Sequence, residues 1–117
     1  MIEVTIHQNN QGEITGFKAC GHADQAPRGQ DIVCAAISTV FELLVDLTAN
    51  FSSGAIKQLK QPAVPLWEWQ VVREKITAEE AQLLDLILSS VARLLAKIAA
   101  GYPKNCRLSS PKQINSS

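Results

Sequence analysis

A histidine and a cysteine lie twelve positions apart, at the two ends of a segment rich in loop-forming residues. His22 follows Gly21, and Cys34 follows the triplet Asp31-Ile32-Val33. Residues 21–30 are mostly glycine, proline and polar residues without apolar periodicity, which is typical of a loop. Such a loop can fold back and bring an imidazole beside a thiol, and an adjacent imidazole activates a cysteine as a nucleophile. The segment therefore indicates a candidate cysteine–histidine pair.

The cysteine also stands where a helix is expected to begin. Apolar residues recur at spacings of three and four after Asp31, which predicts a helix over residues 32–52 with Asp31 as its N-cap. Cys34 would then lie in the first turn, where free amides and the helix dipole favour thiolate over thiol. Asp31 has two interpretations: a cap alone, or a carboxylate that also orients His22.

Neighbouring residues have structural interpretations beside the functional ones. Gly29, expected just before the helix, would let backbone and substrate approach closely, or would serve only as a turn residue. Ser38 lies one turn beyond Cys34 on the same face. Its hydroxyl would make a hydrogen bond either close to the thiol or to a carbonyl of its own helix. A cysteine that faces inward from a helix is usually inert core. The residues alone leave both interpretations open.

Two alternating segments at the amino end must hold the loop in place. Ile2, Val4 and Ile6 alternate with polar residues, so residues 2–7 are expected to form a strand with one buried face. A turn at residues 9–12 would lead into a second strand over 13–20. Its imperfect alternation around Gly16 indicates a bulge.

The rest of the chain predicts further strands and a second long helix. Strands are expected at residues 55–60 and 67–72, with Trp67 and Trp69 on one face of the sheet, and a last strand at 104–108. Between the two strands, the prolines of residues 61–65 indicate a turn.

The second helix has clear start and stop signals. Thr77 and Glu80 match a capping box, and the apolar stripe that follows continues to about residue 100. Gly101 is expected to be a left-handed cap there, followed by Pro103.

Composition narrows the class of protein. The 117 residues and 46% hydrophobic content fit one globular domain, here residues 1–109 followed by a flexible tail, residues 110–117. The expected fold is α/β (α+β): a small mixed or antiparallel sheet of four or five strands, with two long amphipathic helices packed on it. A domain this small with so broad an apolar helix stripe has reason to dimerise.

Charge and cysteine content argue against several partners. Eleven basic and eleven acidic residues leave no net charge to hold nucleic acid, and no long uncharged apolar run predicts a membrane span. The amino terminus lacks the pattern of a signal peptide. Three cysteines at irregular spacing suit a reducing compartment, so a cytoplasmic protein is expected.

Two segments together resemble a known signature. GHA at residues 21–23 and GQDIVCAAIS at residues 29–38 closely resemble the motif of the ribosomal-processing cysteine protease family, Prp. The resemblance implies that Cys34 is the nucleophile and His22 its general base, with Gly21, Asp31 and Ser38 at matched supporting positions. Residues 24–28, Asp-Gln-Ala-Pro-Arg, depart from the aromatic residue and glycine that family members often carry there.

The resemblance also implies a partner and a reaction. Family members are cytoplasmic homodimers that remove an amino-terminal extension from a large-subunit ribosomal protein, the twenty-seventh in the usual naming, after a paired-aromatic site. No metal or organic cofactor is implied. The amides at the start of the first helix would serve as oxyanion donors.

Two other classes of function compete with the protease. One is a metal site using Cys20, His22, Cys34 and Cys106, although Cys20-Gly21-His22 lacks the C-x-x-C spacing of zinc knuckles. The other is a non-catalytic ribosome-assembly or interaction module that presents Trp67 and Trp69 as a recognition surface. The two indoles could instead line the pocket for an aromatic substrate residue, and same-face indoles are most often core.

Overall fold

The computed structural model describes residues 1–21, 28–61 and 66–110, and for residues 28–31 and 61 it describes the backbone alone. The helices and strands of these residues follow in chain order: β1 (Ile2–Gln8), β2 (Ile14–Gly21), α1 (Arg28–Leu47), β3 (Ile56–Gln61), β4 (Leu66–Val71), the short 3-10 helix η1 (Arg73–Lys75), α2 (Ala78–Gly101) and β5 (Cys106–Ser109). The expected tail, residues 110–117, lies almost wholly outside the described residues, and so does most of the proline-containing turn.

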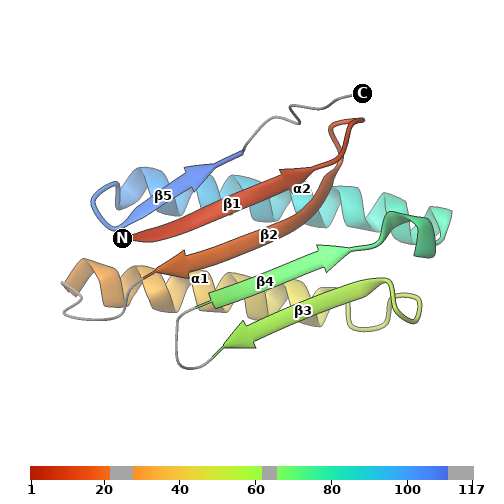
Figure 1. Ribbon diagram of the computed structural model, residues 1–117, viewed down its shortest axis with the longest axis horizontal. Coiled ribbons are helices and arrows are strands. Elements are labelled where there is room, and N and C mark those ends of the chain that lie inside the picture. Colours follow the sequence, from red (N-terminus) through yellow and green to blue (C-terminus); the bar gives the residue numbers. More distant parts are fainter. Residues whose placement is uncertain (22–27, 62–65, 111–117) are drawn as a thin grey trace.

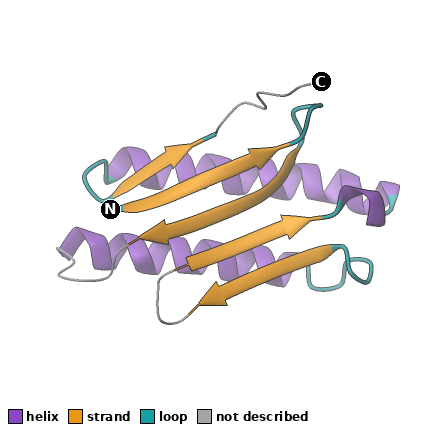
Figure 2. Ribbon diagram, viewed as in Figure 1, coloured by secondary structure: helices purple, strands orange, loops and turns teal. Residues whose placement is uncertain are grey.

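The strands form one mixed sheet with both helices on the same face. The strand order is β3-β4-β2-β1-β5, and every neighbouring pair is antiparallel except β1 with β5, which is parallel. In Figure 1 the helices lie behind the sheet, α2 behind β5 and β1 and α1 behind β2 and β4. Figure 2 shows the same two layers coloured by element type. The α+β fold with a small mixed sheet is therefore confirmed.

The first hairpin follows the sequence expectation. His7 pairs with Gly16 and Gln8 pairs with Ile14, so one extra residue of β2 bulges at this point. The turn before it contains Gly12, whose φ of 81° favours glycine. The predicted turn and bulge are both confirmed.

The first helix begins earlier and ends earlier than predicted. It starts at Arg28, so Gly29 and Asp31 lie inside it and Cys34 lies in its second turn. The predictions that Asp31 is the N-cap and that Cys34 is in the first turn are therefore wrong. Apolar periodicity marks where a helix becomes buried, and here the backbone is already helical before that pattern begins.

A buried threonine, Thr48, follows the last residue of α1 and makes a hydrogen bond to the end of the helix. The Thr48 hydroxyl donates a hydrogen bond to the carbonyl of Leu44 at 2.8 Å, and the chain then turns through Phe51 instead of continuing as a helix. Gly54, with a φ of 75°, completes the reversal into β3. The prediction that the helix extends to residue 52 is therefore wrong by five residues.

The second helix has the predicted capping box. The Glu80 amide donates to the Thr77 hydroxyl at 3.1 Å, and the Thr77 amide donates to the Glu80 carboxylate at 3.0 Å. The same carboxylate accepts hydrogen bonds from the amide and the hydroxyl of Ser52, at 2.9 and 2.8 Å. Hydrogen bonds from Thr77 and Ser52 lower the pKa of Glu80 below its usual value of 4.5. One side chain therefore caps α2 and holds the segment that follows α1.

The other end of α2 differs from the prediction. Gly101 is the last helical residue and Tyr102 is the C-cap, while the described glycines with positive φ are Gly12 and Gly54. The Tyr102 amide still donates to the carbonyl of Ile98 at 3.0 Å, so the helical hydrogen-bond pattern continues past Gly101. The prediction of a left-handed cap at Gly101 is wrong because the chain leaves the helix one residue later.

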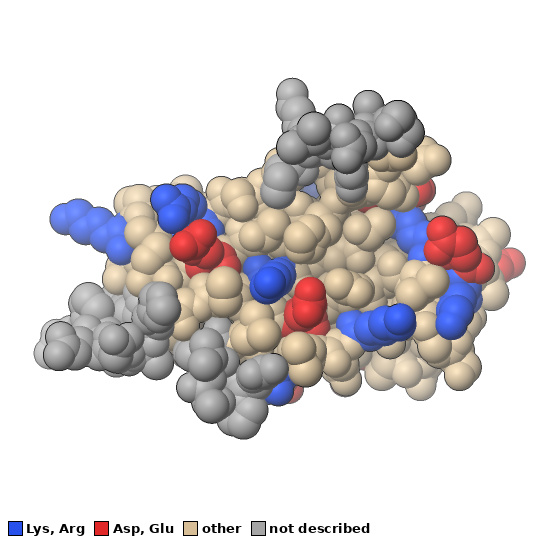
Figure 3. Space-filling model, viewed as in Figure 1, with Lys and Arg blue, Asp and Glu red and all other residues tan. Residues whose placement is uncertain are grey.

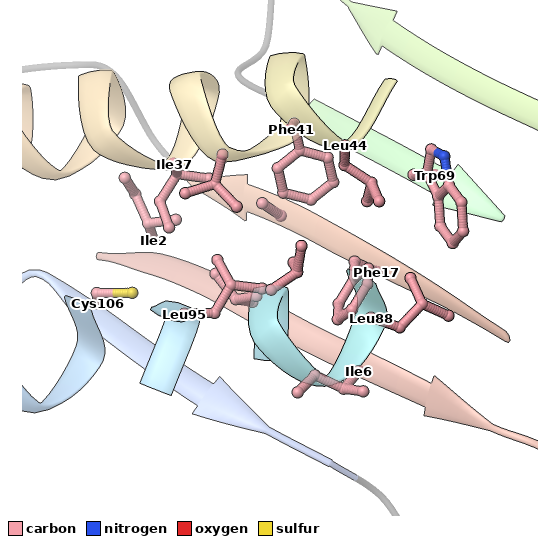
Figure 4. Close-up of a cluster of buried hydrophobic side chains, with 14 of the residues drawn as sticks. Ile2, Ile6, Phe17, Ile37, Phe41, Leu44, Trp69, Leu88, Leu95 and Cys106 are labelled. Carbon is pink, nitrogen blue, oxygen red and sulfur yellow. The ribbon is translucent and has the colours of Figure 1, made fainter. Parts of the chain in front are cut away.

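The core lies between the sheet and the helices. Figure 4 shows Ile37, Phe41 and Leu44 of α1 meeting side chains from the strands, with Leu88 and Leu95 of α2 beside them. All are buried, and Phe17 and Trp69 have no exposed surface. Burial of this apolar area is the main force that fixes the helices to the sheet.

The outer surfaces of the two layers differ in character. Figure 3 shows the sheet side, where basic and acidic side chains are interspersed. The outer side of the helix layer instead has an apolar groove between α1 and α2, and its lining includes Leu43, Leu47, Leu86 and Leu94. These four leucines are between 42% and 67% exposed. Among the described helices, none has an apolar stretch long enough to cross a membrane.

Candidate active site

Cys34 lies in a pocket between α1 and the sheet. The pocket encloses about 270 Å³, including space open to solvent at its mouth. Its walls come from β1, β2, α1 and β4, through Ile2, Ala19, Gly21, Cys34, Ile37, Ser38 and Trp67. Cys34 is partly exposed, so its thiol is neither buried in the core nor on the open surface. A ligand that enters this pocket would meet mostly apolar walls, one thiol and one hydroxyl.

Ser38 connects α1 to β4 at the pocket. Its hydroxyl accepts a hydrogen bond of 3.2 Å from the indole nitrogen of Trp67, and that indole stacks on Phe41 with ring centroids 5.6 Å apart. The sequence analysis considered a bond near the thiol or to a helix carbonyl, and did not anticipate this one. The contact fixes the indole that forms one wall of the pocket.

Gly21 is required by the close approach of two strands. A Cβ atom at this position would lie 2.9 Å from the carbonyl oxygen of Met1 and 3.0 Å from the Cα of Ile2. A larger residue would therefore push β2 away from β1 at the edge of the pocket. Gly21 directly precedes His22 in the sequence, and His22 itself lies outside the described residues.

The three cysteines have different environments. Cys106 is 3% exposed, and burial raises the pKa of its thiol, which disfavours the reactive thiolate. Cys20 lies next to Ala19 on β2, and strand alternation directs it to the sheet face opposite the helices. Cys34 is the one that lines the pocket among the described residues.

The proposed set of metal ligands is not brought together by the described residues. Cys20 lies on the open face of the sheet, whereas Cys106 belongs to the core on the helix side. No group of at least three His, Cys, Asp or Glu side chains is suitably placed for a metal in the part of the chain that the structure describes. The arrangement of the cysteines does not favour the metal-site alternative.

The two tryptophans share one face of β4, as predicted, but only one reaches the pocket. Trp67 is partly exposed and lines it. Trp69 has no exposed surface, packs 6.1 Å from Phe17 between ring centroids, and donates to the Thr48 hydroxyl at 3.4 Å. The expectation that Trp69 contacts substrate is therefore wrong, because it is a core residue.

Lys60 is a residue that the sequence analysis missed. Its ammonium lies 4.4 Å from the centroid of the Trp67 ring, in cation–π contact. The two residues are paired across β3 and β4. Only the strand register reveals this contact, since a separation of seven positions with two intervening prolines gives no periodic signal.

Two predicted site residues, Gly29 and Asp31, lie in the first turn of α1. Gly29 lies within α1 and not just before it, and Asp31 is also helical, with its side chain outside the description. The amides of the first turn belong to residues before Cys34, so the thiol lies one turn away from the free helix amides. The expected contribution of the helix start to thiolate formation is accordingly smaller.

The fold and the pocket together define a small α+β protein with a cysteine in a cleft beside a strand end. Comparison with known proteins gives the family. Residues 1–107 match the family model described as cysteine protease Prp. The chain therefore belongs to the cysteine protease Prp family, as the two sequence motifs had indicated.

Individual relatives agree with this assignment. A 40-residue segment is 42% identical to the ribosomal processing cysteine protease Prp of Bacillus subtilis (strain 168), and it spans 34% of this chain and 36% of that protein. The segment thus covers only about a third of the length of this curated relative.

Two solved structures match nearly the whole chain. One is the essential ribosomal processing protease Prp from S. aureus in complex with a substrate peptide, with a TM-score of 0.78, 26% identity, and coverage of 95% of this chain and 100% of that one. The other is the same S. aureus protease in complex with a covalently linked product peptide, with a TM-score of 0.74, 30% identity and the same coverage.

Proposed function

We propose that this protein is a cytoplasmic cysteine endopeptidase that removes the amino-terminal extension of a large-subunit ribosomal protein, the twenty-seventh in the usual naming. The observation that carries the proposal is the partly exposed Cys34 in a pocket, in a chain whose residues 1–107 match the cysteine protease Prp family. The similar S. aureus protease is named as a ribosomal processing enzyme and binds a substrate peptide.

The chemistry is that of a cysteine–histidine dyad. His22 accepts the proton of the Cys34 thiol, and the thiolate attacks the scissile carbonyl. His22 then protonates the departing amine, and water hydrolyses the thioester that remains. The position of Gly21 in the pocket wall supports this assignment, because Gly21 directly precedes His22 in the chain.

Supporting roles follow from the contacts around the thiol. Ser38 holds the Trp67 indole, and the partly exposed indole forms a wall against which a substrate side chain can pack. Asp31 and Gly29 remain proposed supporting and substrate-binding positions on the basis of the motif that they share with the family.

We also propose a homodimer. The apolar groove between α1 and α2 is lined by exposed leucines, of which Leu86 is 67% exposed, and contact with a second copy would remove this apolar surface from water. Light scattering coupled to gel filtration should give twice the chain mass for the wild type and a smaller mass for Leu86→Glu. Leu59→Glu, which changes an exposed leucine on β3, is the control and should leave the mass unchanged.

Peptide cleavage tests the proposed activity. A peptide that spans the junction of the ribosomal extension should be cut by the wild type and by Cys20→Ala. Cleavage should fall below detection in Cys34→Ala and by roughly 100-fold or more in His22→Ala, since loss of a general base typically costs that much. Circular dichroism should show that all variants remain folded. Full activity in either dyad variant would reject the mechanism, and peptide binding without any cleavage would favour the interaction module.

A further inference from the structure

A second hollow borders the wall of the cysteine pocket. It lies between α1 and the edge strand β3 and is lined by Glu42, Val45, Gln58, Leu59, Lys60 and Trp67. The space is about 720 Å³, including the part open to solvent. Trp67 lines both this groove, which we call the α1–β3 groove, and the pocket that contains Cys34. The two spaces therefore meet at one indole.

The groove continues the line of the pocket along α1. Cys34, Ser38 and Glu42 follow one another at intervals of four residues, so they lie along one side of the helix. Eight helical residues span about 12 Å. An extended peptide advances about 3.3 Å per residue, so about four peptide residues cover that distance. A peptide with its scissile bond at Cys34 can thus place a residue some four positions away beside Glu42.

The chemistry of the groove suits a long basic side chain. Val45 and Leu59 give apolar surface for an aliphatic stem, and the exposed Glu42 carboxylate on the α1 wall can accept a charged head group. No hydrogen bond or ion pair of Glu42 is found among the described residues, so its charge is available to a ligand. The positive charge of Lys60, in contrast, is held over the Trp67 ring.

We infer that the α1–β3 groove is a specificity site, at which Glu42 binds a Lys or Arg side chain of the peptide about four residues from the bond that Cys34 attacks. This inference rests on the proposed peptidase function and adds the chemical class of a remote substrate residue. A basic ribosomal-protein precursor fits such a site, because RNA-binding proteins are rich in Lys and Arg.

Peptide binding to inactive protein tests the inference separately from catalysis. In a Cys34→Ala background, dissociation constants are measured by calorimetry for neutral junction peptides that carry one Lys or one Glu at the third, fourth or fifth position on either side of the scissile bond. At one of these positions the Lys peptide should bind about threefold to fivefold more tightly than the Glu peptide, as expected for an exposed ion pair. The preference should weaken as salt is raised.

Charge reversal gives the decisive comparison. Glu42→Lys should invert the Lys-over-Glu preference, and Glu79→Lys, which changes an exposed residue at the start of α2 that does not line the groove, should retain it. Equal preferences in Glu42→Lys and its parent at every position would overturn the inference. Loss of the preference in both charge variants would also overturn it, because the preference would then depend on the overall charge of the protein and not on contact with Glu42. Failure of the wild type to cleave any of these peptides would contradict the proposed function, while the binding data would still decide the role of Glu42.

Discussion

The two tryptophans of β4 stand two residues apart on the same face of the sheet, yet they belong to regions with different properties. Trp67 is in the pocket end, which we define as Gly21, Cys34, Ser38 and Trp67. Trp69 is in the capped end, which we define as Thr48, Ser52, Trp69 and Glu80. Trp69 is fully buried and bonded to Thr48, whereas Trp67 is partly exposed beside the thiol.

The two regions therefore contribute differently: the capped end stabilises the fold, and the pocket end contains the candidate catalytic cysteine. At the capped end, one carboxylate accepts hydrogen bonds from both Ser52 and Thr77 and so joins two chain segments far apart in sequence. At the pocket end, Gly21, Cys34, Ser38 and Trp67 line a space that opens to solvent. A small domain can leave such an opening at one end because its other end is tightly packed and hydrogen-bonded.

Thiol reactivity should show the largest difference between a pocket residue and a core residue. With iodoacetamide at pH 8, Cys34 should be alkylated faster than Cys106 by a factor on the order of 1,000 or more, because Cys106 reacts only when the core opens. Burial also raises the pKa of Cys106 and so lowers its thiolate fraction. Peptide mapping by mass spectrometry measures both rates, and comparable rates in the folded protein would contradict the assignment of Cys106 to the core.

Replacing the two tryptophans should have different effects: loss of Trp69 should mainly lower stability, and loss of Trp67 should mainly lower activity. Trp69→Ala should lower the free energy of unfolding by about 3–5 kcal/mol, because it leaves a cavity in the core. Trp67→Ala should cost less stability but lower kcat/KM for the junction peptide roughly tenfold, because one pocket wall is lost. Urea unfolding and peptide cleavage measure the two quantities. If Trp67→Ala proved the more destabilising variant, the distinction between the regions would be wrong.

Two glycines offer a smaller, matched comparison. Gly21→Ala should destabilise the protein by about 1–3 kcal/mol, since the added Cβ meets the backbone of β1 at 2.9–3.0 Å. Gly101→Ala should be neutral or stabilise by up to about 1 kcal/mol, because a Cβ there meets nothing and alanine favours the helix. Thermal unfolding of both variants measures these changes. A Gly21→Ala variant as stable as the wild type would show that β1 and β2 can separate at no cost.

The charge of Glu80 should give the smallest effect, and one that depends on pH. The folded pKa of Glu80 lies below its unfolded value, so its stabilising contribution is present above about pH 4.5 and is lost as the pH falls through the folded pKa. Glu80→Gln should therefore be less stable than the wild type at pH 7, and the gap should narrow below pH 4.5. The neighbouring Glu79→Gln, which lacks these hydrogen bonds, is the control. A gap that stays constant from pH 7 to pH 3 would contradict the role of the Glu80 charge.

Local patterns in the sequence predicted most of the fold. Alternation in Ile2–Gln8 and the capping box at Thr77 are set by neighbours within a few residues, so they could be read directly. The start of α1 could not be predicted in this way, because residues 28–31 contain no apolar residue and so carry no apolar periodicity. The hydrogen bonds between Ser52 and Glu80 also could not be predicted from local patterns, since only the tertiary fold brings these two residues together.

Part of the candidate site was predictable, but the contacts within it were not. The motif identified Cys34, Ser38 and Gly21, and the structure places all three around one pocket. Periodicity placed Trp67 and Trp69 on one face but could not show which is accessible, because their exposure depends on Phe41, Thr48 and other residues distant in sequence.

Mass spectrometry of a quenched reaction tests the role of Cys34 most directly. The wild type is mixed with the junction peptide, quenched in acid within the first turnover and digested. The account predicts that the Cys34 segment carries the mass of the amino-terminal product as a thioester, and that Cys34→Ala neither carries this mass nor cleaves the peptide. Cleavage at the wild-type rate by Cys34→Ala, or an acyl group on any other residue, would contradict it.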